Sequence, residues 1–171
     1  TATGGGGGAI DAGIAGESCE LPEQLTGARL VTGTTIGFSN DVTLPCVGSP
    51  TPAGNRVFAL TIPANTTLTA TVRGTGGQPD LDGGARAFDP SLELVAAPAT
   101  NCHGTMCLAA DDSGDETTTN RVDFVNRGAA TDVFIVVDSA ASSSATLSTE
   151  GTFELGVAFA ANIESIRRGL E

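Results

Sequence analysis

Large apolar residues alternate with polar residues along most of the chain after Cys19, which is the period of a β-strand with one buried face. The clearest alternating runs are Phe58–Ile62, Thr67–Arg73, Leu92–Leu94, Arg121–Phe124 and Thr152–Phe159. Val133–Val137 is apolar at every position, as in a central strand covered on both faces. Shorter candidates are Ala28–Thr35 and Cys107–Ala110. The pattern predicts about eight strands.

Clusters of Gly, Pro, Asp, Ser and Thr separate these runs and mark turns. The prediction is an all-β chain that forms an antiparallel β-sandwich, jelly-roll-like, over residues 18–160. Residues 1–17, with five consecutive glycines, form a Gly/Ala-rich N-terminal arm that we expect to be extended. Residues 161–171 form a C-terminal tail or a short helix, since Ile163, Ile166 and Leu170 have helical spacing behind a capping Asn162.

Composition narrows the possible functions. The chain has 20 acidic and 8 basic residues, a net charge of −12, which disfavours nucleic-acid binding and adsorption to anionic lipids. Its longest run of large apolar residues, Val133–Val137, is far shorter than the ~20 residues of a membrane span, so we expect no membrane insertion. The sequence contains no Lys, Tyr or Trp, which excludes Schiff-base chemistry and a P-loop lysine.

His103 is the single histidine and therefore the only candidate imidazole base. No G-x-S-x-G nucleophile elbow accompanies it. We interpret it as an exposed turn residue and predict that the protein is not an enzyme.

Four cysteines in an acidic, Thr- and Gly-rich β-type chain favour an oxidising compartment, and we predict a secreted or cell-surface protein. The predicted pairs are Cys19–Cys46 and Cys102–Cys107, although four cysteines allow three pairings. A zinc site at Cys102, His103 and Cys107 is the alternative, and it lacks the C-x-x-C spacing.

An acidic turn follows the second pair of cysteines and offers oxygen ligands to a hard cation. Asp111, Asp112 and Asp115 are the candidate calcium ligands, and Ca²⁺ is the only cofactor that the sequence indicates. The alternative interpretation is a solvated acidic turn without a metal.

Several short motifs follow one another along the chain in a characteristic order. They are Cys19, Asn40–Asp41, Cys46, Asn55–Pro63, Leu68–Val72, Phe88–Leu94, Cys102, Cys107, Asp111–Asp112, Val133–Asp138 and Gly151–Val157. In this order they resemble the bacterial pre-peptidase C-terminal domain, in its Cys-containing form from secreted proteins. The resemblance implies a compact β-sandwich, usually an accessory module beside a secreted peptidase, and in some members binding of Ca²⁺ or of a matrix substrate.

These observations predict a non-enzymatic extracellular structural module that associates with itself, as a surface or filament subunit. The N-terminal arm would add to the exposed sheet edge of a neighbouring copy, with Ile10 and Ile14 filling small pockets. The alternative is an accessory binding module of a secreted peptidase-type protein, which recognises matrix protein or polysaccharide with possible calcium support.

Overall fold

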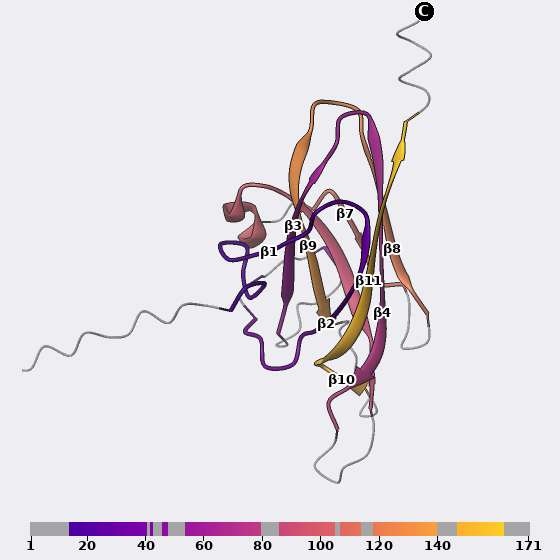
Figure 1. Cartoon of the computed structure of the whole chain (residues 1–171). Helices are drawn as coiled ribbons and strands as arrows, with labels where there is room; N and C mark the ends of the chain where they lie inside the picture. Colours follow the sequence, from indigo (N-terminus) through magenta and orange to yellow (C-terminus); the bar gives the residue numbers. More distant parts are fainter. Residues whose placement is uncertain are drawn as a thin grey trace, which may run out of the picture.

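The computed structural model describes residues 14–40, 42, 46–47, 54–79, 86–104, 107–113, 118–139 and 147–162. Over these ranges the chain forms two facing β-sheets, seen edge-on in Figure 1, and a 3-10 helix, η1 (Ala99–His103). The first sheet has the order β1 (Glu23–Gln24), β3 (Arg56–Ile62), β9 (Thr131–Ser139), β6 (Pro90–Ala96) and β7 (Ala109–Asp111). The second has the order β2 (Arg29–Thr34), β11 (Gly151–Ala161), β4 (Thr66–Gly77) and β8 (Asn120–Asn126).

Pairing is antiparallel throughout both sheets except between β1 and β3. A separate parallel bridge joins β5 (Ala87–Phe88) to β10 (Leu147–Ser148). The all-β sandwich and all eight predicted strands are confirmed. The sequence did not indicate the two-residue strands β1, β5 and β10. In the described ranges no helix has the length and apolar character needed to cross a membrane.

One hydrophobic core lies between the two sheets. It contains the inward residues of β3, β9 and β6 on one side and of β4, β8 and β11 on the other. At its centre the rings of Phe58 and Phe153 meet edge to face, with centroids 6.2 Å apart. Gly33 on β2 lies directly over Phe153, where a Cβ atom would come within 2.5 Å of the ring. The missing side chain therefore lets the edge strand close over this aromatic pair.

A second, smaller core covers the outer face of the five-stranded sheet. Its buried members are Cys19, Val42, Val57, Val95, Cys102, Phe134 and Val136. It explains why Val133–Val137 is apolar at every position: alternate residues of β9 enter the inter-sheet core, and the others enter this second core. The prediction of a strand covered on both faces is confirmed.

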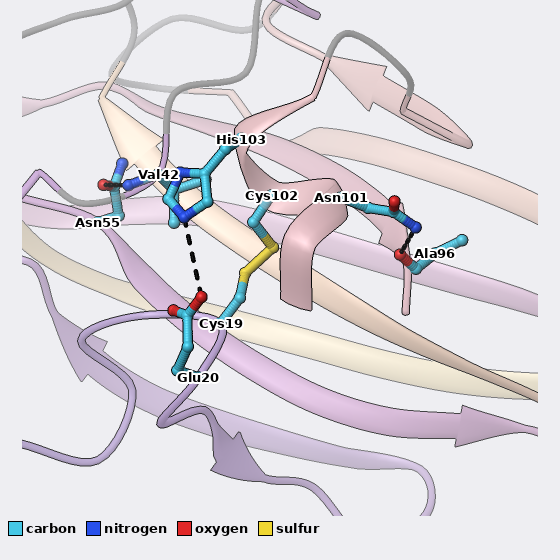
Figure 2. Close-up of a disulfide and its surroundings, with 8 residues drawn as sticks. All are labelled: Cys19, Glu20, Val42, Asn55, Ala96, Asn101, Cys102 and His103. Atoms are coloured by element: carbon cyan, nitrogen blue, oxygen red, sulfur yellow. Dashed lines mark hydrogen bonds and ion pairs between the residues drawn. A yellow bond between two sulfur atoms is a disulfide. The ribbon is translucent and has the colours of Figure 1, made fainter. Parts of the chain in front are cut away.

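The predicted disulfide pairing is wrong. The structure joins Cys19 to Cys102 and Cys46 to Cys107, with Cα–Cα distances of 6.4 and 6.2 Å. Each disulfide links a segment that packs on the second core to the part of the chain between η1 and β7. Figure 2 shows the Cys19–Cys102 disulfide. Cys102 and Cys107 are close in sequence but reach different segments. The short loop between them favoured a disulfide between the two. The prediction failed because the sequence pattern does not reveal which segments pack over the outer face of the five-stranded sheet.

The N-terminal segment packs against the β-sandwich through backbone hydrogen bonds to β3. The Val57 amide donates a hydrogen bond to the Gly16 carbonyl (2.8 Å), and the Leu25 amide donates to Ala59 (2.9 Å). Ile14 is 56% exposed. Residues 1–13, with Ile10, lie outside the described residues, as does the predicted helix beyond Asn162. The division into arm, domain and tail therefore stays a prediction.

Candidate functional site

Strand β6 carries polar residues on the outer face of the five-stranded sheet, although it contributes leucines to the inter-sheet core. Leu92 and Leu94 face inward, so Ser91 and Glu93 face outward with Val95. An outward-facing residue of a sandwich normally meets water, but Ser91 and Glu93 are only 0% and 2% exposed. A carboxyl group is thus enclosed on the face that the second core covers.

Two further carboxylates lie beside Glu93. Ser91 is paired with Asp138 of β9, which places both side chains on the outer face. Glu93 is paired with Ala110 of β7, and Asp112 follows two residues later on the same side. Ser91, Glu93, Asp112 and Asp138 together are called the Glu93 cluster below.

The carboxyl of Glu93 is held in its neutral form. Burial, followed by the negative charges of Asp138 and Asp112, raises the pKa of Glu93 from 4.5 to about 8. Burial and the neighbouring charge of Asp111 also raise the pKa of Asp112. Within the described residues, the buried Ser91 hydroxyl and the buried Oδ1 of Asp112 have no hydrogen-bond partner. The cluster therefore contains two buried oxygen atoms without a hydrogen-bond partner among the described residues.

Asp111 has a different environment from Asp112. Its carboxylate accepts hydrogen bonds from the Arg121 amide (2.7 Å) and from the amide and hydroxyl of Ser113 (3.0 and 2.6 Å). Burial opposes its ionisation, but these hydrogen bonds outweigh burial and lower the pKa of Asp111. Asp115 lies outside the described residues, within which no three acidic, His or Cys side chains already converge as metal ligands. Calcium at Asp111, Asp112 and Asp115 stays a prediction.

His103 is exposed at the end of η1, as predicted. Figure 2 shows its ring facing Glu20, with Nε2 3.8 Å from Oε1 and both side chains more than half exposed. The same view shows Asn101 donating to the Ala96 carbonyl (2.9 Å), and the Val42 amide donating to Asn55 (3.0 Å). All four cysteines are in disulfides, so none of them is available as a metal thiolate or nucleophile. The zinc alternative is thereby excluded.

The four-stranded sheet has two edges, β2 and β8, on which no further described strand pairs. Leu30 on β2 is 68% exposed and Val125 on β8 is 40% exposed. A groove runs beside the end of β2, lined by Thr32, Gly33, Thr34, Phe38, Arg56, Thr75, Thr152 and Phe153. The β2 edge is thus a long strand edge with an exposed leucine and a neighbouring groove.

Arg56 connects this groove to the N-terminal segment. Its guanidinium lies 4.4 Å from the centre of the Phe38 ring and forms an ion pair with Glu23. Gly16 lies so close to it that a Cβ atom would be 2.7 Å from the Arg56 Nε. The chain therefore reaches the body near the end of the β2 edge.

The sequence pattern did not indicate Ser91, Glu93 or Asp138 as site residues. Val133–Val137 predicts a strand covered on both faces, but the sequence does not indicate that the strand with Glu93 lies beside it. The pairing of β6 with β9 is seen only in the structure.

Comparison with known proteins shows a likeness of fold. No family model and no curated protein matches the sequence. Among solved structures, the chain is similar to a periplasmic inhibitor of g-type lysozyme from Aeromonas hydrophila. That match has 13% identity and a TM-score of 0.50 over 81% of this chain and 95% of the other.

The chain is also similar to the pre-peptidase C-terminal domain of a collagenase from Bacillus anthracis. This match has 12% identity and a TM-score of 0.46 over 79% of this chain and 92% of the other. The two disulfides favour an oxidising location, such as the cell exterior or the periplasm.

Proposed function

We propose that this chain is a non-catalytic extracellular module that associates with further copies of itself. In this proposal, residues 1–13 of one copy add as a strand to the β2 edge of the next. The observation that carries the proposal is the β2 edge, six residues long, with Leu30 68% exposed and no described strand beyond it. An open edge offers backbone donors and acceptors to an incoming strand.

The composition of the arm suits such an addition. Its run of Gly and Ala residues permits close backbone approach, and Ile10 and Ile14 provide side chains large enough to fill pockets. Ile14 is 56% exposed and is therefore available to a neighbour. Gly16, close to the end of the arm, lies beside Arg56, which also lines the β2 groove. A contact that does not close between two copies propagates into a filament.

Sedimentation velocity tests the proposal with a matched pair of variants. Leu30→Asp places a charge on the β2 edge, and Val125→Asp places the same charge on the β8 edge of the same sheet. Both residues are exposed, so both variants should fold. We expect concentration-dependent assemblies for the wild type and for Val125→Asp, and monomers for Leu30→Asp. A monomeric wild type, or equal effects of the two substitutions, would overturn the proposal.

A second candidate is an accessory module that binds a different macromolecule, either matrix protein or polysaccharide. It is favoured by the fold shared with a protein that is named as a lysozyme inhibitor, and hence as a binder of another protein. Pull-down on insoluble collagen and on polysaccharide separates the two candidates. Retention of a purely monomeric chain on either matrix supports the second candidate, and assembly without retention supports the first.

A further inference from the structure

We propose that a pocket on the outer face of the five-stranded sheet binds the C-terminal tail of the same chain, residues 163–171, through Arg167 and Arg168. The pocket lies where β3 ends and β9 begins, beside the two-residue strand β1. It is separate from the β2 edge, which belongs to the other sheet. The residues that line it include Cys19, Glu20, Thr61, Ala97, Asp132 and Phe134.

Two carboxylates give this pocket its negative charge. Asp132 is exposed and accepts a hydrogen bond from the Thr61 hydroxyl (2.6 Å). The Glu20 side chain is 58% exposed and lies beside the Cys19 disulfide, with the His103 ring 3.8 Å away (Figure 2). His103 is charged only when it is protonated, and within the described ranges no arginine pairs with either carboxylate. The pocket therefore offers two acidic groups to a cation.

Several other residues that line the pocket are apolar, among them Ala59, Ala97 and Phe134. An arginine side chain matches this combination, because its methylene stem packs on apolar surface while its planar guanidinium donates to carboxylates. The guanidinium also stacks on aromatic rings. The pocket thus has the chemistry of a site for arginine.

The tail begins near this pocket. The Asn162 amide donates a hydrogen bond to the Asn65 carbonyl (2.8 Å), in the turn between β3 and β4. Asn65 follows Thr61 by four residues, which span at most about 14 Å. Arg167 follows Asn162 by five residues, which span about 18 Å when extended. An extended tail can therefore bring its arginines from the end of β11 to the pocket of the same chain.

Charge favours this tail over other segments. Arg167 and Arg168 are the only two adjacent basic residues in a sequence with eight arginines and 20 acidic residues. The net charge of −12 makes two copies of the chain repel each other. Tethering instead gives the tail a high effective concentration at the pocket of its own chain. The geometry and the charge thus select the same occupant.

Limited digestion of the full chain with trypsin tests the docking, because trypsin must take an arginine side chain into its own specificity pocket. Intact mass measures the loss of the residues that follow Arg167 or Arg168. Glu20→Gln/Asp132→Asn removes both carboxylates of the pocket at exposed positions. We expect this variant to lose the end of its tail about three- to tenfold faster than the wild type, since exposed ion pairs are individually weak.

Asp123→Asn/Glu154→Gln is the matched control. It neutralises two carboxylates on the other sheet, which pair with Arg121 and Arg73, and it changes the net charge by the same amount. We expect its tail to be cleaved at the wild-type rate. Far-UV circular dichroism establishes that each variant is folded.

Three results would overturn the inference. The first is an equal cleavage rate in the wild type and the pocket variant. The second is an equal acceleration in the pocket variant and the control, which would reflect net charge alone. The third is protection of the pocket variant by an excess of Arg167→Ala/Arg168→Ala chain that leaves cleavage of a free peptide unchanged, because the tail would then bind another copy.

Discussion

Replacing Glu93 with glutamine should remove a steep pH dependence of stability in calcium-free buffer. Burial and the charges of Asp138 and Asp112 raise the pKa of Glu93 from 4.5 to about 8. The folded state therefore favours the protonated carboxyl, and its stabilising effect is complete below the ordinary pKa and is lost as the pH rises to about 8. Glutamine stays neutral over the whole range and avoids this loss.

The magnitude follows from the size of the pKa change. One pKa unit corresponds to about 1.4 kcal/mol, so a change from 4.5 to about 8 corresponds to at most about 5 kcal/mol. Movement of Asp112 away from the cluster would relieve part of the repulsion. We expect the wild type to lose about 2 to 4 kcal/mol of unfolding free energy between about pH 5 and pH 8. Glu93→Gln should then be the more stable protein at the upper end of this range.

Urea denaturation in EDTA, followed by far-UV circular dichroism, measures this difference because the chain has no Trp or Tyr for fluorescence. Asp123→Asn is the control. Hydrogen bonds from Arg121 and then Thr69 lower the pKa of Asp123, so its contribution changes only in more acidic solution. Its curve should run parallel to that of the wild type. Wild-type stability that is constant between about pH 5 and 8, or an equally steep fall in Glu93→Gln, would refute the reasoning.

Three further changes test the packing, each by its urea denaturation midpoint. Replacing Cys19 and Cys102 together by serine opens a bridge between residues 83 apart and should cost about 4–5 kcal/mol; an unchanged midpoint would contradict the observed pairing. Phe153→Ala removes a ring that is 1% exposed in the inter-sheet core and should cost about 3–5 kcal/mol, whereas a cost below about 1 kcal/mol would argue against this core. Gly74→Ala drives a methyl group against the Phe88 carbonyl oxygen and should cost about 1–3 kcal/mol; a neutral effect would show that β4 and β5 are farther apart.

The fold was largely predictable because alternation of polar and apolar residues is a local signal. Leu68, Ala70 and Val72 share one face of β4, and their inward orientation follows from a two-residue period alone. The strands β1, β5 and β10 have only two residues each, too few to show an alternation of polar and apolar positions. Ala87 and Phe88 pair with residues some 60 positions away, and a bridge this short leaves no trace in the sequence pattern.

The candidate site was less predictable because it depends on what covers the outer face of the five-stranded sheet. Glu93 alternates with Leu92 and Leu94, a pattern that indicates a polar residue directed to solvent. The segments that carry Cys19 and Cys46 instead pack over this face and are bound by disulfides to Cys102 and Cys107. The same non-local packing made the pairing prediction wrong and enclosed the carboxyl of Glu93.

Mixing two singly defective chains tests self-association through the arm most directly. Deleting residues 1–13 removes the donor strand and keeps the contact between Gly16 and Val57. Leu30→Asp blocks the acceptor edge and keeps the arm. Each chain alone should sediment as a monomer, and the mixture should form a one-to-one complex that does not grow further. A mixture that sediments as two monomers, or an arm-deleted chain that still assembles alone, would contradict the account.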